Sequence, residues 1–387
     1  MPPASTQPSA RGRLAGVDEH PHARALLLPA LPPNGKPSHA YLFHGPAGTG
    51  KRAVAKAFAA ALLADGAEDR EGVEARVARE AHPDLTWVRP SGASEVLVSD
   101  IDEAVVAAVA HTPFESARRV FVIEAAGSMN EQAGNRLLKT LEEPPEFAHL
   151  ILLAEHREDV LPTIASRCQQ VRFDPLSSEV IAERLIAADA GIEAARARGC
   201  ARLASGDGRL AERLAGEEGV ALRERGERFA RAAFGPSSRA GERPWRALLD
   251  AAKVAGTQAG ADAGERLRER AELLPSKERR KYERESAEVV RRAERRARTA
   301  ALDLGLRLAE LWLRDAWCVA VGAPELVFAV DRLGELTAEA DRDVSSLGEG
   351  VELVRDTRLR LALNVSEELA LEALFYRLAE LLGSPGD

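Results

Sequence analysis

The 387-residue chain has few cysteines, few aromatic residues and few lysines. Its three cysteines, Cys168, Cys200 and Cys318, are widely spaced and odd in number, which fits a reducing cytoplasm. No Cys-x-x-Cys pair offers a metal site. No stretch approaches about 18 consecutive apolar residues, so we expect no membrane-spanning segment. Residues 1–13 are rich in Pro and Ser and lack an apolar segment, which predicts a flexible tail rather than a signal peptide.

The charge balance is acidic, with 53 Lys and Arg against 61 Asp and Glu and a formal net charge of −8. This argues against a protein that coats nucleic acid by bulk charge, so any contact with DNA must be local or made through partners. Only 7 of the 53 basic residues are lysines, so a lysine at a motif position is less easily explained as background. The length favours two or three domains.

The first half of the chain alternates short apolar runs with helical patterns. The candidate strands are residues 41–43, 85–88, 120–123, 150–153 and 170–173. The candidate helices are residues 52–64, 99–110 (with Ser99 and Asp102 as a capping box) and 130–142. This alternation predicts an α/β fold with a mostly parallel sheet in three layers.

After Pro175 the strand signals fade, and an all-α region is predicted. Segments 178–190 and 194–215 are helical in pattern, whereas 217–226 is charged and resembles a connection. Clusters of Gly, Pro and Ser between 232 and 264 predict a domain boundary. The remaining expected helices are residues 276–320 and a last helix that starts at Asn364 with Glu367 at its N3 position.

A glycine-rich loop, Gly45 to Arg52, follows the first candidate strand and precedes a helix. It fits the phosphate-loop pattern G-x-x-x-x-G-K-[ST] at every position but the last. Gly45, Gly48 and Gly50 would let backbone N–H groups cradle phosphate oxygens, and Lys51 would reach the β- and γ-phosphates. The alternative is a glycine-rich turn without a ligand.

Two positions that an active nucleotide hydrolase needs carry unsuitable residues. Arg52 stands where a Ser or Thr hydroxyl would bind Mg²⁺. The buried strand Val120–Ile123 ends in Glu124, a Walker B pattern, but the second carboxylate is replaced by Ala125. The sequence therefore predicts that phosphate binding can survive while metal placement and hydrolysis are lost.

Three strings together resemble one family. They are His39-Ala40-Tyr41-Leu42-Phe43, Asn135 to Pro145 (NRLLKTLEEPP) and Leu161 to Cys168 (LPTIASRC). They resemble the clamp-loader subunits of bacterial DNA polymerase III, and among these the delta-prime subunits. The resemblance is strong over residues 14–175 and weaker beyond. It implies a RecA-like AAA+ core (P-loop NTPase fold) followed by a helical lid and an all-α collar. The expected domains are a tail at 1–13, the core at 14–175, the lid at 176–235 and the collar, which oligomerises, at 236–387.

The resemblance also implies a function. Such a subunit would join gamma/tau and delta in a hetero-pentamer that loads the β sliding clamp onto primed DNA. Ser166, Arg167 and Cys168 would form an SRC motif, with Arg167 as an arginine finger at a neighbouring gamma/tau ATP site. Its own site (Gly45, Gly48, Gly50, Lys51 and Glu124) would be degenerate. It would require no cofactor, and would at most bind ATP or ADP weakly without hydrolysis. The alternative for Arg167 is an ordinary charged surface residue beside a strand, with no role at a nucleotide site.

Some positions depart from the family pattern. No cysteine precedes Cys168, so we expect none of the zinc that many relatives carry. Ala154 stands where a polar sensor residue is expected, a further sign of a silent site. Arg209 in Gly-Asp-Gly-Arg is a candidate second sensor or an ordinary surface residue. Residues 277–298 carry 10 basic and 5 acidic side chains. This indicates either a solvated helix face with Glu–Arg pairs such as Glu288–Arg292 and Glu294–Arg298, or a surface for DNA.

Three rival functions remain. A catalytically active gamma/tau-like ATPase would need Ser or Thr at position 52 and an acid at position 125. A Holliday-junction helicase would need an intact phosphate loop and a winged-helix tail, where this chain predicts a helical bundle. An AAA+ scaffold unrelated to replication is disfavoured by the combined NRLLKTLEEPP and SRC strings.

Overall fold

The structure, a computed structural model, describes residues 14–90, 96–235, 243–272, 276–339, 343–361 and 365–383, without the side chains of 266 and 269–285. The expected tail at 1–13 lies outside these ranges. The chain divides into two compact units. Unit 1 comprises the residues up to Leu176 together with Gly206–Gly208, and unit 2 comprises Ser177–Ser205 and the residues from Arg209 onward.

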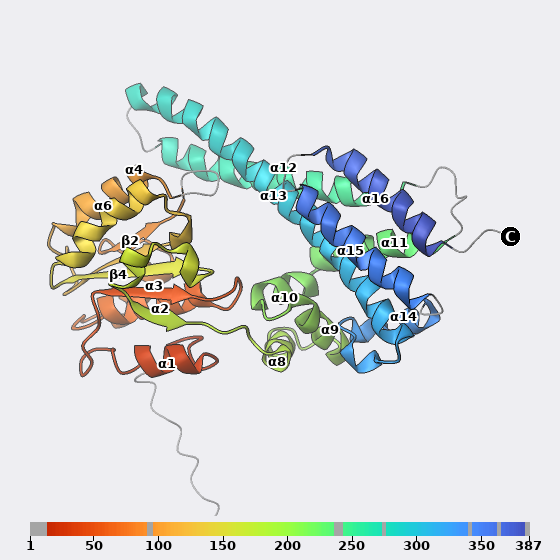
Figure 1. The fold of residues 1–387 in the computed structure, drawn as a ribbon. Helices are drawn as coiled ribbons and strands as arrows, with labels where there is room; N and C mark the ends of the chain where they lie inside the picture. The colour runs from red at the N-terminus through yellow and green to blue at the C-terminus, as the bar shows by residue number, and fades with distance from the viewer. Residues whose placement is uncertain are drawn as a thin grey trace, which may run out of the picture. The chain divides into compact units, whose positions relative to one another are not determined.

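Unit 1 contains a sheet with helices on both sides (Figure 1). The sheet has five parallel strands in the order β2-β3-β4-β1-β5. The strands are β1 (Ala40–His44), β2 (Leu85–Val88), β3 (Arg119–Ile123), β4 (Ala148–Ala154) and β5 (Gln169–Arg172). Each lies where the sequence predicted a strand. Because all five are parallel, the segments that follow them meet at one edge of the sheet and the segments that precede them meet at the other.

Helices cover both faces of this sheet, because side chains alternate along each strand. In β1, Tyr41 and Phe43 enter one core with α1 (Pro21–Leu27), α2 (Lys51–Leu63) and α3 (Arg70–Ala78). Ala40 and Leu42 enter the other. That second core contains helices from the opposite face, which are α4 (Val98–Ile101), the π-helical η1 (Asp102–Val106), α5 (Ala107–Val109), α6 (Glu131–Glu142) and α7 (Pro162–Ala165). Two 3₁₀ turns, η2 (Ala126–Ser128) and η3 (Arg157–Asp159), complete the unit. The predicted three-layer α/β fold is confirmed.

The helix expected at 99–110 begins differently. Its N-cap is Leu97, not Ser99, and the Asp100 carboxylate accepts the Leu97 N–H at 2.9 Å. The predicted capping box with Asp102 is therefore wrong. Asp102 instead receives two hydrogen bonds from Arg136 of α6, at 2.7 and 3.0 Å, and a π-helical turn starts at this residue. The Asp102 carboxylate, which the local pattern assigned to the helix cap, therefore pairs with an arginine of another helix.

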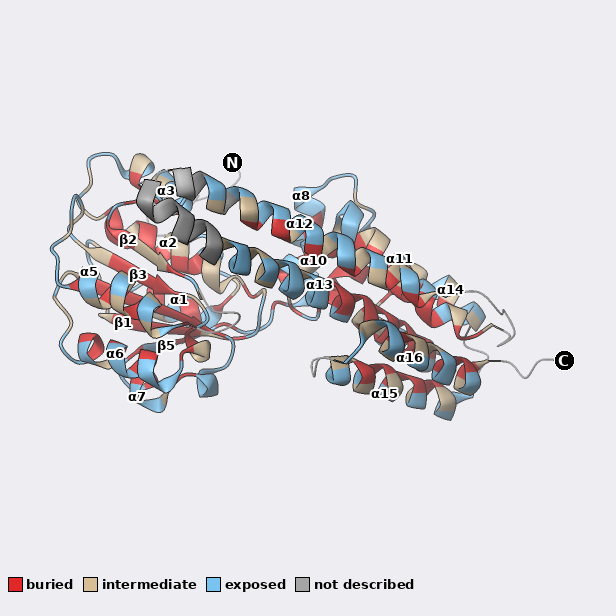
Figure 2. Ribbon diagram, turned by 90° about the horizontal axis from the view of Figure 1, so that it is seen from above, coloured by how far each residue is buried: buried red, intermediate tan, exposed pale blue. Residues whose placement is uncertain are grey.

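Unit 2 is all-α. Its elements are α8 (Ser178–Ala188), α9 (Ala194–Ala204), α10 (Gly208–Ala215, whose first residue belongs to unit 1), α11 (Glu217–Ala232), α12 (Trp245–Glu272), α13 (Ser276–Ala320), the 3₁₀ turns η4 (Pro324–Leu326) and η5 (Val330–Arg332), α14 (Leu333–Glu339), α15 (Val344–Leu361) and α16 (Glu367–Leu382). Helices α11 to α16 share one hydrophobic core around Trp245 and Trp312. Figure 2 shows buried residues gathered along the sheet of unit 1 and on the facing sides of these helices.

The single helix predicted over 194–215 is two helices. It breaks at Ser205 and Gly206, whose φ angles of 51° and 92° lie in the left-handed region. A methyl group on Gly206 would come to 2.6 Å from the Pro175 Cβ, so glycine is needed here for its size as well. The break brings Gly206–Gly208 into unit 1.

Two segments, one predicted to be a connection and one to contain a domain boundary, include helices. The charged stretch 217–226 is the start of α11, and α12 runs through most of the expected boundary at 232–264, of which 236–242 lie outside the described residues. In α12 the glycines allow close packing, because a methyl group on Gly256 would come to 2.9 Å from the Glu294 backbone oxygen in α13. The sequence pattern treated these glycines as signs of a helix end, whereas they allow α12 and α13 to pack closely.

The last helix, α16, has Ser366 as its N-cap residue, which makes Glu367 its first residue rather than its third. Asn364, the predicted start, lies outside the described residues. Within the ranges given above, no helix combines the length and the apolar character that crossing a bilayer requires.

Candidate functional site

The phosphate loop connects the end of β1 to the start of α2, and its glycines occupy backbone positions that other residues would strain. Gly45 has φ 148°, and a methyl group there would come to 2.0 Å from the Phe173 backbone oxygen after β5. Gly50 is the N-cap of α2 with φ 87°. The loop is also fixed through Thr49, whose backbone oxygen lies 2.7 Å from the buried His20 Nε2. The strand–loop–helix geometry is that of a helix N-terminus suited to anions.

Asp207 lies against this loop. A methyl group on Gly48, whose φ is 71°, would come to 1.6 Å from Asp207 Oδ1. The Gly208 N–H donates to the Gly48 backbone oxygen at 3.2 Å. A carboxylate therefore stands directly beside the phosphate loop.

Lys51 is turned back onto its own loop. Its Nζ donates to the backbone oxygens of Gly45 (2.5 Å) and Pro46 (2.6 Å). Burial lowers the pKa of the Lys51 ammonium, and the nearby carboxylates of Glu155 and Asp207 oppose that shift. The lysine that would reach a phosphate is thus bound to carbonyl groups of the loop.

Arg52 and Glu124, the two positions that a Mg²⁺ ion would lie between, contact each other directly. Arg52 Nε is 3.2 Å from Glu124 Oε1. The Trp87 indole N–H donates to the same carboxylate oxygen, and the Arg52 guanidinium lies 5.5 Å from the Trp87 ring centroid. A cationic side chain therefore pairs with the carboxylate that ends the Walker B pattern.

A second carboxylate, Glu80, extends this cluster. It pairs with Arg52 (3.2 Å), with Lys56 (2.7 Å) and with Arg89. Burial would raise the pKa of Glu80, but hydrogen bonds from Lys56 and Arg89 outweigh it and lower the pKa to about 2. Glu80 therefore stays ionised at neutral pH and helps to hold the Arg52 guanidinium near Glu124.

The two alanines that the sequence singled out lie at the same edge of the sheet. Ala154 is buried at the end of β4, opposite His44 of β1. Ala125 follows Glu124 with φ 53° and ψ 43°, a left-handed conformation. Neither methyl side chain can orient a water molecule or bind a metal ion.

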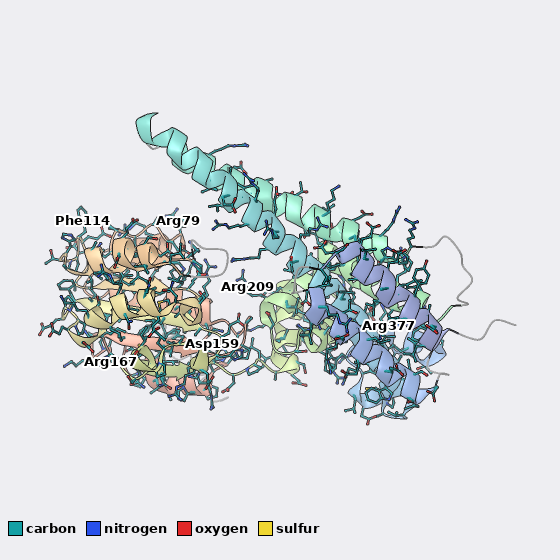
Figure 3. All side chains as sticks on the ribbon, turned by 45° about the horizontal axis from the view of Figure 1, so that its top comes forward. Arg79, Phe114, Asp159, Arg167, Arg209 and Arg377 are labelled. Atoms are coloured by element: carbon teal, nitrogen blue, oxygen red, sulfur yellow. The ribbon has the colours of Figure 1, made fainter. Side chains whose placement is uncertain are left out.

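Arg167 lies at the opposite edge of the sheet from the phosphate loop. It precedes β5, where Gln169 is paired with Tyr41 of β1, whereas the loop follows β1. Its side chain lies on the surface of unit 1 and is 37% exposed (Figure 3). Its NH1 and NH2 donate to the Thr163 backbone oxygen (2.9 Å) and to Glu142 Oε1 (2.7 Å). Arg167 is thus accessible and remote from its own chain's loop.

The neighbours of Arg167 in the SRC motif differ in burial. Ser166 is exposed, and its hydroxyl donates to the Thr163 backbone oxygen at 3.1 Å. Cys168 is buried in the core beneath α6, and burial raises the pKa of its thiol to about 12. The thiol stays protonated at neutral pH, so Cys168 is a packing residue and not a nucleophile.

The structure brings the two most specific strings together. A hollow of ≈ 540 Å³ at the edge where the strands begin is lined by both, with Leu141, Glu142 and Pro144 from one string and Ser166, Arg167 and Cys168 from the other. The sequence interpretation missed Glu142 as a partner of Arg167, although it lies within the quoted string. It also missed Asp207, which only the break between α9 and α10 brings to the loop.

Other predicted features have less specific surroundings. Arg209 is exposed on α10, and a sensor role stays a prediction. In the basic stretch, the side chains of 277–285 lie outside the described residues. Beyond them, Arg292 pairs with Glu288 at 3.2 Å as expected, but Arg298 donates to Glu367 at 2.9 Å rather than to Glu294. Among the described residues, no three His, Cys, Asp or Glu side chains gather as a metal site requires.

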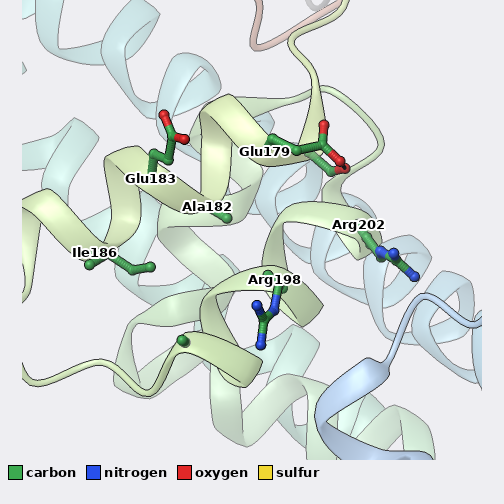
Figure 4. Close-up of a pocket in the computed structure, with 8 residues that line it drawn as sticks. Glu179, Ala182, Glu183, Ile186, Arg198 and Arg202 are labelled. Carbon is green, nitrogen blue, oxygen red and sulfur yellow. Dashed lines mark hydrogen bonds between the residues drawn. The ribbon is translucent and has the colours of Figure 1, made fainter.

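A separate hollow lies between α8 and α9 in unit 2 (Figure 4). Its volume of ≈ 240 Å³ is below the roughly 300–1,000 Å³ of small-molecule sites. Its lining combines Ala182 and Ile186 with Glu179, Glu183, Arg198 and Arg202.

The sheet order, with a glycine-rich phosphate loop between β1 and α2, defines unit 1 as an α/β AAA+ core with the P-loop NTPase fold. Residues 25–177 match the family model described as DNA polymerase III, delta subunit. The delta-prime subunit of DNA polymerase III from Bacillus subtilis (strain 168) is 39% identical over 163 residues, 41% of this chain and 49% of that protein. Over residues 25–177 the chain is therefore similar to this family, and over 41% of its length to a delta-prime subunit.

The chain is also similar to another subunit of DNA polymerase III and to a solved structure. The tau subunit of DNA polymerase III from the same organism is 34% identical over 161 residues, 38% of this chain and 27% of that protein. A solved structure of a DNA polymerase III gamma subunit-related protein from Thermotoga maritima has a TM-score of 0.42 at 17% identity, over 89% of this chain and 94% of that chain. The chain spans about half the length of the delta-prime relative that it matches.

Proposed function

We propose that this chain is the delta-prime-like subunit of a bacterial replicative clamp loader, that it supplies Arg167 to the ATP site of a neighbouring gamma/tau subunit, and that it does not hydrolyse ATP itself. The observation that carries the proposal is the position of Arg167. The register places Gln169 level with Tyr41, and the phosphate loop starts four residues after Tyr41. Four residues of strand span roughly 13 Å, which is more than an arginine side chain bridges along the sheet. Arg167 can therefore act on a phosphate only in another chain.

The surroundings of this chain's own phosphate loop support the second part of the proposal. Lys51 donates to loop carbonyls, Asp207 stands beside Gly48, and Arg52 pairs with Glu124. A Mg²⁺ ion would have to displace a guanidinium that two carboxylates hold. We therefore propose that the subunit requires no cofactor and binds ATP or ADP at most weakly, without hydrolysis and without zinc.

An arginine that reaches a neighbouring active site stabilises charge on the transferring γ-phosphoryl group. Such a finger contributes about 10³–10⁵ in turnover. The proposed partners are gamma/tau and delta subunits in a cytoplasmic hetero-pentamer, and through it the β sliding clamp and primed DNA. The proposed domains are the core at 14–175, the lid at 176–235 and the oligomerising collar at 236–387.

The test is the ATPase activity of the loader reconstituted with its own gamma/tau and delta subunits, stimulated by clamp and primed DNA. Arg167→Ala in this subunit should reduce turnover at the adjacent site by at least about 10³, while Lys51→Ala should leave turnover within about twofold of the wild type. Since the other sites of the ring continue to hydrolyse, single-turnover rates should be measured along with the steady state.

The alternative is a catalytically active gamma/tau-like ATPase, which the similarity to tau and the intact Gly45, Gly50 and Lys51 keep open. In that case Lys51→Ala would abolish turnover by the isolated chain and Arg167→Ala would not change it. This pattern would overturn the proposal.

A further inference from the structure

We propose that Glu142 is the positioning residue for Arg167, holding the guanidinium so that its remaining N–H groups face a phosphate of the neighbouring subunit. This inference rests on the proposed function. The observation behind it is the hydrogen bond between Glu142 and Arg167, which are 25 positions apart in the chain. Glu142 does not touch the phosphate itself, so its effect must pass through Arg167.

Two acceptors hold the Arg167 guanidinium. Glu142 Oε1 accepts from NH2 at 2.7 Å, and the Thr163 backbone oxygen accepts from NH1 at 2.9 Å. A guanidinium has five N–H donors in a planar fork, so these contacts use two and leave three. Because each acceptor binds a different nitrogen, together they define the plane of the fork. A defined plane is what two-point recognition of a phosphate requires.

Both acceptors stand on elements that the core immobilises. Glu142 is the last residue of α6, which buries Leu137 and Leu141 against the sheet. The chain then turns at Pro144, so the helix cannot extend. Thr163 lies in α7, whose Ile164 is fully buried in the same core. Packing therefore fixes the Thr163 backbone oxygen and the backbone of Glu142, while the half-exposed side chains of Glu142 and Arg167 are the parts left to move.

The expected effect follows from the exposure of the pair. The side chains of Arg167 and Glu142 are 37% and 51% exposed, and such pairs contribute modestly to stability. Loss of Glu142 should therefore leave folding unchanged but free the arginine to sample other rotamers. We expect a loss of about three- to fivefold in turnover rather than the far larger loss from removing the arginine.

The adjacent Glu143 supplies a matched control. It is exposed, it neighbours Glu142 in the chain, and Glu143→Gln removes the same charge. Glu142→Gln keeps an oxygen acceptor of nearly the same shape, so it should restore most of what Glu142→Ala loses. Arg167→Ala and the double variant Glu142→Ala/Arg167→Ala complete a double-mutant cycle.

The experiment uses the reconstituted loader, with clamp and primed DNA, and compares these five variants. Because the other sites of the ring continue to hydrolyse ATP, kcat and KM for ATP are taken from single-turnover rates at the site beside this subunit. Glu142→Ala should lower kcat about three- to fivefold with KM unchanged, Glu143→Gln should match the wild type, and the double variant should equal Arg167→Ala alone. Circular dichroism melting curves verify that each variant folds.

The outcomes separate this inference from the function that it rests on. If Arg167→Ala has no effect, the proposed function fails. If Arg167→Ala is severe but Glu142→Ala matches the wild type or raises kcat, only the positioning role is refuted. An additional loss in the double variant over Arg167→Ala would also refute it, because Glu142 would then act independently of the arginine.

Discussion

Replacing Arg223 by Met should destabilise unit 2 by about 3–5 kcal/mol, because it removes the centre of a buried ion network. Arg223 of α11 is 4% exposed. Its Nε donates to Glu227 at 2.6 Å, and its NH1 and NH2 donate to the two carboxylate oxygens of Asp331 at 2.8 and 2.9 Å. Methionine fills much of the volume but supplies none of the three hydrogen bonds.

The magnitude follows from what the substitution leaves behind. The Glu227 and Asp331 side chains are only 8% and 14% exposed, so water replaces the lost donors poorly. The nearest other described cation is Arg332, whose Nε is 3.8 Å from Glu227 Oε2, too far for a hydrogen bond. Removing the arginine leaves buried carboxylates without their main cationic partner, and this strongly destabilises the folded state.

The destabilisation should depend on pH. Burial raises the pKa of Glu227 and Arg223 opposes that shift, so in the variant the folded-state pKa rises further. An acid whose pKa is higher in the folded than in the unfolded state favours folding while it is protonated. The stability of the variant should therefore fall as the pH rises above about 4.3, the unfolded value. The difference from the wild type should be larger at pH 8 than at pH 5.

Urea unfolding followed by tryptophan fluorescence provides the assay. In a Trp87→Phe background the remaining tryptophans, Trp245, Trp312 and Trp317, all belong to unit 2, so the signal reports on that unit. Arg228→Met, at an exposed position of the same helix, should change the free energy of unfolding by less than about 0.5 kcal/mol. A loss below about 1 kcal/mol for Arg223→Met, or a loss independent of pH, would refute the reasoning.

Two further predictions concern unit 1. Asp207→Ser should tighten binding of a fluorescent ADP analogue, titrated in EDTA, by more than about tenfold, because it removes a like charge beside the loop; unchanged affinity would mean that Asp207 does not oppose phosphate. Asp84→Asn should lower the free energy of unfolding at pH 7 by about 1–3 kcal/mol, because the buried Asp84 carboxylate accepts backbone N–H groups from Phe114, Glu115 and Ser116. These hydrogen bonds outweigh burial and lower the pKa of Asp84. In thermal melts, the difference in stability between the wild type and the variant should therefore shrink as the pH falls below about 3.9. A difference that stays constant with pH would contradict this reasoning.

Much of the candidate site could be predicted from its residue types. The spacing of Gly45, Gly50 and Lys51 requires a loop at a helix N-terminus, and Arg52 cannot bind a cation in any fold. The sequence could not show that Arg52 would pair with Glu124, because these residues lie on α2 and at the end of β3. Only the parallel register of the sheet brings their side chains within 3.2 Å.

The α/β architecture of unit 1 follows from local signals. Buried strands of a parallel sheet are short and apolar, and the turns between them carry Gly and Pro, so each strand could be located from the chain alone. The helices of unit 2 were harder to predict, because their glycines and charges have long-range causes. Gly226 lies against α13, where a methyl group would come to 2.6 Å from the Gly305 backbone oxygen, and Arg223 is charged yet buried.

The sequence by itself determined the glycine-rich loop, the absence of a hydroxyl at position 52 and the arginine beside β5, because each depends on residue type and on neighbours in the chain. Tertiary structure alone decided that Asp207 lies on the loop, that Glu142 holds Arg167, and that Arg167 and the loop occupy opposite edges of the sheet. The physical reason is that these contacts join residues far apart in sequence. Their distances depend on strand order, on register and on a helix break, none of which a local pattern encodes.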